Sequence, residues 1–308
     1  MSNFVCDLCP RKCHAARPKS ASPGVRIPGI CAEPLNPVVA RAGLHFWEEP
    51  VISGARGSGA VFFSGCNLHC VFCQNYGIST EHEGIEITPE RLGEIYRELI
   101  RLGAHNINLV TPQHFTESIL QSLPAEGLPV PVVYNTNGYE SVETLRRFEG
   151  RVQIYLPDFK YFDNALALRY SGAADYRERA MEAIDEMFRQ TGPYETGGDG
   201  MLKKGVIIRH LLLPGHVADT LRVIEYVAKH FRPGDIIFSL MRQYMPCGKV
   251  SENSYPELNR KVTFLEYRRV REALLRSGIA DGYFQGKSAA SGEFIPVFDG
   301  EGVLPSLR

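Results

Sequence analysis

The sequence predicts an α/β fold, in the form of a partial (β/α)6 TIM-like barrel with a cysteine-rich N-terminal extension. From residue 60 onward, strand-like and helix-like segments alternate about six times, which is typical of a parallel sheet with right-handed crossovers. Six such units fall short of the eight that close a barrel. The chain has 308 residues and no evident internal repeat, a size at which barrels are often single domains. We therefore expect the cysteine-rich extension over 1–55, the partial barrel over 56–280 and a C-terminal tail packing on the barrel over 281–308.

The individual elements follow from apolar periodicity and from helix signals. In the first helix, Thr88 is a plausible N-cap, Pro89 suits the first turn and apolar residues recur on one face. A glycine cluster over 194–201 predicts a mobile loop, and 282–300 predicts a final strand and a tail lying across the barrel. The expected strands are 60–65, 106–111, 130–137, 152–159, 206–214 and 235–244; the expected helices are 88–103, 114–123, 141–150, 176–190, 218–231 and 264–278.

Composition narrows the function classes. The formal net charge is −1, which gives no global electrostatic attraction to nucleic acid or membrane. No apolar run of about 18 residues is present, and the N-terminus lacks the apolar region of a signal peptide. Eight cysteines in clusters indicate a reducing compartment and metal ligation rather than disulfides. We expect a cytoplasmic protein without a nucleic-acid or membrane partner.

The most specific motif is C-x3-C-x2-C, formed by Cys66, Cys70 and Cys73 directly after the first expected strand. Three thiolates at this spacing can hold three corners of a [4Fe–4S] cluster and leave the fourth iron without a protein ligand. An open metal position is where a small molecule can coordinate. Zinc is the alternative, but a structural zinc site usually takes four ligands in two paired arms. The motif therefore favours an iron–sulfur cluster.

This triplet resembles the signature of the radical S-adenosylmethionine superfamily, C-x3-C-x-aromatic-C, with Phe72 in the aromatic position. More narrowly, the chain is similar to the activating enzymes of pyruvate formate-lyase and their uncharacterised relatives. The resemblance implies that the open iron binds the amino and carboxylate groups of S-adenosylmethionine. One electron would then cleave a carbon–sulfur bond, giving methionine and a 5′-deoxyadenosyl radical that abstracts hydrogen from a substrate.

The resemblance also implies partners. A flavodoxin or ferredoxin would supply the electron. In a true activating enzyme the hydrogen would come from a glycine of a partner protein; the alternative is a small molecule or another macromolecule. A non-enzymatic iron–sulfur redox protein is a remote alternative, because electron carriers normally give each iron a protein ligand.

Polar residues at the expected strand ends are further candidates, because barrels carry their chemistry there. Asn135, Thr136 and Asn137 stand in N-T-N-G, which resembles the family's D-T-N-G with Asn135 in place of the Asp. That change puts a cation site there in doubt, and a plain turn is the alternative reading. The resemblance assigns this segment to the methionine end of the cofactor.

Two further strand ends carry charge. Asp158 and Lys160 match the family's D-L-K and, two residues apart in a strand, can pair on one side. We assign them to steering the cofactor or the substrate; a structural ion pair at the strand end is the alternative. Arg209 lies in an apolar run at the family's I-R-x-x-x-x-P-G, which suggests a cofactor contact; a core ion pair with a barrel carboxylate is the alternative. His210 should point to the opposite face, as a surface or helix-packing histidine.

The second strand end departs from the family pattern. Residues 110–114 read V-T-P-Q-H where the activating enzymes have a G-G-E turn, so Thr111 and Gln113 are the candidates for equivalent polar atoms. Gln243 ends the sixth strand where the family commonly has a histidine. Asn75 follows the triplet in C-x-N and is a candidate for bonding cofactor or loop. These departures indicate a subgroup with its own substrate.

The N-terminal extension holds a second cysteine group, Cys6, Cys9, Cys13 and Cys31. Four thiols in a segment too polar to build its own core suggest metal-dependent folding. Zinc, a second iron–sulfur cluster, or a flexible segment with Cys13 unused all fit this pattern; a zinc-dependent nucleic-acid module is disfavoured by the near-zero net charge. Cys247 reads as a small buried residue, with radical relay as the alternative, and His45 and Trp47 are expected to pack rather than ligate.

Overall fold

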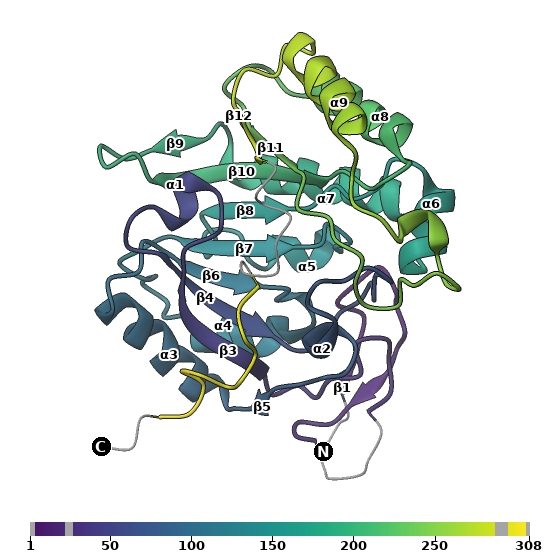
Figure 1. Cartoon of the computed structure of the whole chain (residues 1–308). Helices are drawn as coiled ribbons and strands as arrows, with labels where there is room; N and C mark the ends of the chain where they lie inside the picture. Colours follow the sequence, from purple (N-terminus) through teal and green to yellow (C-terminus); the bar gives the residue numbers. More distant parts are fainter. Residues whose placement is uncertain (1–3, 22–26, 287–294, 306–308) are drawn as a thin grey trace.

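The computed structural model describes residues 4–21, 27–286 and 295–305, and Figure 1 shows their arrangement. The strands are β1 (Phe4–Val5), β2 (Ala16–Arg17), β3 (Val38–His45), β4 (Ser58–Phe63), β5 (Ile85–Glu86), β6 (Ile107–Val110), β7 (Val132–Thr136), β8 (Ile154–Pro157), β9 (Glu195–Thr196), β10 (Leu202–Leu211), β11 (Ile237–Met241) and β12 (Gly282–Phe284). The helices are α1 (Pro50–Ser53), α2 (Tyr76–Ser79), α3 (Pro89–Arg101), α4 (Thr116–Ser122), α5 (Val142–Arg146), α6 (Asn164–Ser171), α7 (Tyr176–Thr191), α8 (Val217–His230) and α9 (Phe264–Arg276), with short 3-10 turns η1 (Gln113–Phe115) and η2 (Pro256–Leu258).

One open sheet forms the centre of the molecule. Its strand order is β12-β11-β10-β8-β7-β6-β4-β3-β5, and β9 pairs with β10 beside this path. The strands between β12 and β4 in that order are parallel to one another, whereas β3 is antiparallel to both of its neighbours, β4 and β5. The predicted α/β class with a mostly parallel, unclosed barrel sheet is confirmed, and all six expected strands are present.

Helix formation follows the expected signals. The Thr88 side chain accepts a hydrogen bond from the Arg91 backbone N–H and caps α3, whose buried face packs against β3, β4 and β6. Helix α9 begins with a reciprocal capping box between Thr263 and Glu266, a stable helix start. Helix α9 packs against α8, whereas α3 and α7, the latter on β8 and β10, pack directly on the outer face of the sheet.

One local prediction needs correction, and one strand was not predicted. The segment expected as a mobile loop at 194–201 contains the short strand β9, which pairs antiparallel with β10. The sequence reasoning missed β3, which pairs with β4 from Val39 opposite Phe63 to His45 opposite Ser58, and with β5 on its other side. Its run V-V-A-R-A-G-L-H mixes small residues with Arg41, so neither an apolar alternation nor a continuous apolar run marks it as a strand.

Strand parity decides which residues enter the barrel. Alternate residues of a strand face opposite sides, so Ile154, Ile207 and Ile237 turn inward and pack with Ile52 of α1. Helix α1 thereby covers the amino-terminal end of the barrel interior. One step further along the strands the inward positions become polar, and this layer forms the site.

The C-terminal segment returns to the first edge of the sheet. The Ala42 N–H donates to the Glu301 carbonyl at 2.9 Å, and the Gly300 N–H donates to the Ala40 carbonyl at 3.0 Å. Figure 1 shows this yellow segment beside β3 and α3. It borders the open side of the barrel.

Candidate active site

The three triplet cysteines lie in the loop between β4 and α2, and each sulfur accepts a hydrogen bond. Asn137 Nδ2 and the Leu68 N–H donate to Cys66 Sγ, both at 3.4 Å. The Ser171 hydroxyl donates to Cys70 Sγ at 3.0 Å, and the Ser79 hydroxyl donates to Cys73 Sγ at 3.3 Å. Donors around cysteine sulfurs stabilise thiolates and tune iron–sulfur clusters. The donor set therefore fits a cluster bound at this loop.

Two of the triplet thiols, those of Cys70 and Cys73, are protonated in the absence of a metal. Burial raises the pKa of Cys70, and burial together with the neighbouring Cys70 raises the pKa of Cys73 to about 12. Lys160 opposes the shift at Cys70. Metal binding would deprotonate these groups. In the described ranges no three His, Cys, Asp or Glu side chains are already arranged to hold a metal ion.

A cavity of about 230 Å³ extends from the triplet into the barrel. Of the residues predicted as site residues, it is lined by Cys70, Phe72, Cys73, Asn75, Asn135, Asp158, Lys160, Arg209 and Gln243. These residues come from the triplet loop and from the ends of β7, β8, β10 and β11. The barrel thus brings together groups that are up to 173 positions apart in the sequence, from Cys70 to Gln243.

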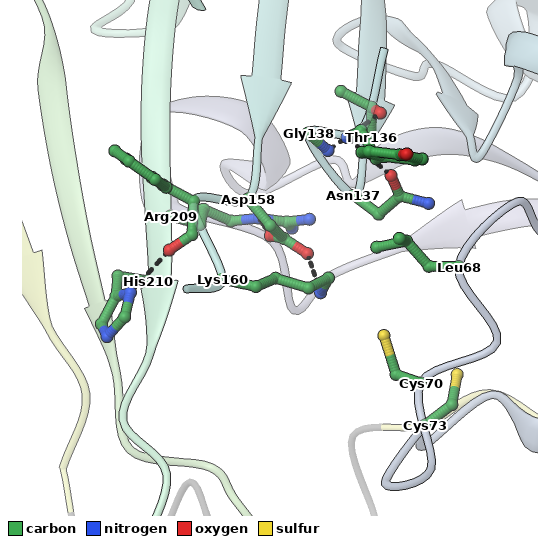
Figure 2. Close-up of polar contacts among 12 residues, drawn as sticks. Leu68, Cys70, Cys73, Thr136, Asn137, Gly138, Asp158, Lys160, Arg209 and His210 are labelled. Carbon is green, nitrogen blue, oxygen red and sulfur yellow. Dashed lines mark hydrogen bonds and ion pairs between the residues drawn. The ribbon is translucent and has the colours of Figure 1, made fainter. Parts of the chain in front are cut away.

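An ion network forms one wall of this inner cavity. Arg209 Nε donates to Asp158 Oδ1 at 2.8 Å, and Lys160 Nζ donates to Asp158 Oδ2 at 2.6 Å. Figure 2 shows Lys160 reaching from the end of β8 toward the loop of Cys70 and Cys73. Burial opposes every charge here, yet Arg209 and Lys160 hold the pKa of Asp158 below its usual value, and Asp158 raises the pKa of both cations. All three groups are charged at neutral pH.

Sequence reasoning missed Glu48, which completes this network. Its Oε2 accepts from Arg209 Nη1 at 3.1 Å, and its Oε1 accepts from Asn108 at 3.1 Å and from Asn135 at 3.0 Å. Asn135 Oδ1 in turn accepts from Arg209 Nη2 at 2.7 Å. The carboxylate absent at position 135 is therefore supplied beside it by Glu48. Two features of the sequence could have indicated this role. Glu48 and Glu49 follow an aromatic segment, and Asn108 is a polar residue at an inward position of β6.

Arg209 accordingly forms the core ion pair that was the alternative reading at this position, and its guanidinium still lines the inner cavity. Glu49 lies behind it, fully buried, and burial raises the pKa of its carboxyl against the opposing charge of Arg209. One Glu49 oxygen has no hydrogen-bond partner among the described residues.

Five predicted residues of the barrel do not line the inner cavity: Cys66, Thr111, Gln113, Thr136 and Asn137. Thr111 has a left-handed φ of 60°, and Thr136 faces the helix side, where its hydroxyl bonds to Glu140. Gln113 Oε1 accepts from Asn67 at 2.7 Å, and Asn67 Oδ1 accepts from Asn137 at 2.7 Å. These three amides form a chain behind Cys66 and brace the triplet loop.

The remaining lining residues have local roles. The Phe72 ring packs edge-on against Tyr161, Tyr170 and Tyr244. Asn75 precedes α2 without a side-chain cap bond, and the Gln243 side-chain oxygen accepts from Gln285 at 2.8 Å. The barrel therefore fixes the aromatic residue of the triplet and leaves amide groups at the cavity rim.

The N-terminal cysteines lie against the triplet loop. Cys6 and Cys31 are buried, and Cys13 is exposed. Burial and the nearby thiols Cys6 and Cys31 raise the pKa of Cys9 to about 12, so these three lie close together. Gly65 has φ +77°, and a Cβ there would lie 2.8 Å from the Cys31 carbonyl oxygen. The extension thus contacts the residue directly before Cys66.

Two arginines fasten this contact. Arg11 Nε donates to the Asn67 carbonyl at 2.8 Å, and Arg11 Nη2 donates to the Ser171 carbonyl at 2.9 Å. Arg17 is 1% exposed and donates to the His114 carbonyl at 2.6 Å. Both arginines join the extension to the segments that hold the triplet.

The structure also positions four other residues singled out in the sequence. His210 is buried, not on the surface, and bonds to the Phe159 carbonyl and to Thr220 of α8. The Cys247 thiol donates to the Phe72 carbonyl at 3.0 Å, and burial raises its pKa to about 11. His45 and Trp47 line the inner cavity instead of only packing.

Residues 60–227, more than half of the chain, match the family model of the Radical SAM superfamily. The chain belongs to this superfamily. The family implies a [4Fe–4S] cluster and S-adenosylmethionine, and the buried triplet with its sulfur donors fits that cofactor set. No described helix is long and apolar enough to cross a membrane.

Relatives of this radical SAM protein leave its substrate open. It is 32% identical over 241 residues to the uncharacterized protein MJ0674 of Methanocaldococcus jannaschii; the match covers 74% of this chain and 64%, less than two thirds, of that relative. Methylornithine synthase (PylB) aligns at 13% identity with a TM-score of 0.49, over 87% of this chain and 73% of that structure. The maturase HydG of Carboxydothermus hydrogenoformans aligns at 13% identity with a TM-score of 0.45, over 85% and 57%. These structural likenesses carry no conclusion about substrate.

Proposed function

We propose that this protein is a radical enzyme that cleaves S-adenosylmethionine reductively and abstracts hydrogen from a substrate. The observation that carries the proposal is the inner cavity, which joins Cys70 and Cys73 of a family triplet to the buried cations Lys160 and Arg209. When bound, the cluster and S-adenosylmethionine would take up one electron, release methionine and pass a hydrogen atom from substrate to the 5′-deoxyadenosyl group.

The chain's own residues have distinct roles in this proposal. Cys66, Cys70 and Cys73 hold the cluster, and Asn137, Ser171 and Ser79 donate hydrogen bonds to their sulfurs. Lys160 and Asp158 offer opposite charges at the cavity wall, where they suit the carboxylate and amino groups of a bound amino acid moiety. Arg209 and Glu48 fix Asp158 and Asn135 in place, because their hydrogen bonds are directed at both.

The substrate class is the finer part of the proposal. N-T-N-G, D-F-K and the Arg209 motif support the activating-enzyme branch, in which a glycine of a partner protein would supply the hydrogen. The V-T-P-Q-H turn and the cysteine-rich extension support a different substrate, either a small molecule or another macromolecule. We favour the second class, because aromatic residues line the route into the cavity.

The extension is proposed as a second metal site. Proximity of Cys6, Cys9 and Cys31 supports it, and zinc and iron remain the two candidates. A variant with Cys66, Cys70 and Cys73 changed to Ala separates them: retained iron identifies a second cluster, and retained zinc a structural site. A flavodoxin- or ferredoxin-like protein is the proposed electron donor, and the cytoplasm the proposed compartment.

The direct test of the function is anaerobic reconstitution with iron and sulfide, followed by reduction in the presence of S-adenosylmethionine. We expect 5′-deoxyadenosine and methionine in equal amounts, and neither product from the Cys66→Ala, Cys70→Ala, Cys73→Ala variant. An intact cluster that never yields 5′-deoxyadenosine would refute the proposed function.

A further inference from the structure

We propose that a second cavity, on the open side of the barrel beside β3, is the substrate subsite and holds an uncharged aromatic group hydrogen-bonded to His45. This inference rests on the proposed function, because it takes the inner cavity as the place where the cofactor reacts. The outer cavity has a volume of about 170 Å³.

The outer cavity communicates with the inner one. His45, Trp47, Phe62, Ile295 and Pro296 line both cavities, so the two spaces meet at these side chains. The meeting point lies between β3 and the C-terminal segment, where the sheet is not closed into a barrel. A molecule entering from this side therefore faces the triplet across the inner cavity.

Charge is segregated between the two spaces. The inner cavity carries Glu48, Asp158, Lys160 and Arg209, which suits a zwitterionic cofactor. Of the described residues that line the outer cavity, only Arg41 is charged, and its guanidinium is already paired with Glu301 at 2.5 Å and with Asp299 at 3.4 Å. Among these residues a charged ligand would lose hydration without gaining a counter-ion. The described lining therefore favours an uncharged group.

His45 supplies the polar function of this space. Burial, and secondarily Arg41, lowers its pKa to about 4, so the imidazole is neutral at physiological pH. No ring nitrogen of His45 is hydrogen-bonded to another residue in 4–21, 27–286 or 295–305, although its backbone carbonyl accepts from Ser53. A neutral imidazole carries one donor and one acceptor, and partly buried polar groups normally find partners. A hydroxyl or amide on the ligand can meet this demand.

Aromatic walls define the rest of the ligand. The Phe62 ring stands edge-on to His45, with centroids 5.7 Å apart and an interplanar angle of 87°. Trp47 forms the rim and is 61% exposed, which is unusual for so large an apolar side chain. Edge-to-face partners of this kind stabilise a bound aromatic ring beyond the burial of its surface area. A glycine residue of a partner protein has no side chain to contact these aromatic rings. An aromatic substrate therefore fits this cavity better than a glycyl backbone.

The test uses the fact that Trp47 is the only tryptophan in the chain. Its fluorescence, excited at the red edge of the tryptophan band, reports on this cavity without cluster or turnover. We would titrate the full-length protein with p-cresol, with 4-methylcyclohexanol and with 4-hydroxybenzoate. We expect saturable binding of p-cresol, and at least about fivefold weaker binding of the non-aromatic and the charged compound.

Variants locate the binding. Phe62→Leu should weaken p-cresol binding about fivefold, and His45→Gln, which keeps a hydrogen-bonding group but not the ring, should weaken it as well. Phe264→Leu is the matched control, because Phe264 is 64% exposed on α9 and away from the cavity; its binding should equal that of the wild type. Thermal melts show whether each variant is folded. If one of the two cavity variants does not fold, the other one still tests the proposal.

Three results would overturn the proposal. They are absence of p-cresol binding, equal binding of the three compounds, and competition between p-cresol and S-adenosylhomocysteine, which would mean that the cofactor fills this space. Failure of the proposed function is distinguishable, because it shows as missing 5′-deoxyadenosine in the wild type whatever p-cresol does.

Discussion

At the scale of single residues, Glu48 is the least expected member of the site and the most open to test. It links Arg209, Asn108 and Asn135 and is itself only 10% exposed. Removing one partner of a buried ion pair leaves an uncompensated charge and costs about 3–5 kcal/mol. Here Asp158 still pairs with Arg209 and compensates part of its charge. We expect Glu48→Gln to lower the free energy of unfolding in urea by about 3 kcal/mol.

Glu94→Gln is the control for this variant. Glu94 pairs with Arg91 at 3.1 Å but is 50% exposed, and exposed pairs contribute about 0–1 kcal/mol. Equal losses in the two variants would mean that Glu48 does not hold the polar layer of the barrel together.

Glu140 gives a pH dependence. It is fully buried behind β7, where Thr136 and Tyr134 donate to it, and burial raises its pKa to about 8. An acid whose folded pKa exceeds its unfolded value of 4.5 binds its proton more tightly when folded, so stability falls as pH rises between these values, by up to about 1.4 kcal/mol per pH unit. We expect the melting temperature of Glu140→Gln to exceed that of the wild type increasingly from pH 5 to pH 8. A constant difference across that range would show that Glu140 does not titrate with a raised pKa.

At the scale of elements, the cysteine-rich extension stabilises the triplet loop through Arg11. Its guanidinium donates to carbonyls of Asn67, Ser171 and Gly172, and Ser171 in turn donates to Cys70. Losing these bonds costs roughly 1–3 kcal/mol. We expect Arg11→Met to speed amide hydrogen exchange in residues 66–73 about tenfold.

Arg147→Met provides the comparison for Arg11, since Arg147 is 39% exposed and pairs with Glu117 at 2.6 Å on the surface. Its exchange over 66–73 should match the wild type. If amide exchange in Arg11→Met equals that of the wild type, the extension does not stabilise the triplet loop through Arg11.

The elements also show how far sequence reasoning reached. Apolar periodicity and caps predicted the six barrel strands and their helices, because these segments bury one face each. Strand β3 escaped because its pattern, V-V-A-R-A-G-L-H, mixes buried small residues with polar ones. The triplet and the charged pair of Asp158 with Lys160 were visible as local motifs. Glu48 was not, because its partners Asn108, Asn135 and Arg209 come together only when three parallel strands lie side by side.

At the scale of the whole molecule, the open barrel contains two connected cavities with different linings. The triplet loop and charged strand ends bound the inner space, and side chains of β3, of the segment that follows it and of residues 295–296 bound the outer one. Figure 1 shows how β3 and the C-terminal segment form this edge together. The same incomplete closure that distinguishes this sheet from an eight-stranded barrel thus provides a side entrance to the site.

In the proposed function, Cys66, Cys70 and Cys73 hold a cluster whose remaining iron binds S-adenosylmethionine. Electron–nuclear double resonance on the reduced, reconstituted protein, with nitrogen-labelled S-adenosylmethionine, measures this contact directly. We expect a hyperfine coupling between the nitrogen of the labelled amino group and the cluster. This coupling should be absent in the Cys66→Ala, Cys70→Ala, Cys73→Ala variant. A reduced cluster in the wild-type protein that shows no such coupling at saturating S-adenosylmethionine would contradict it.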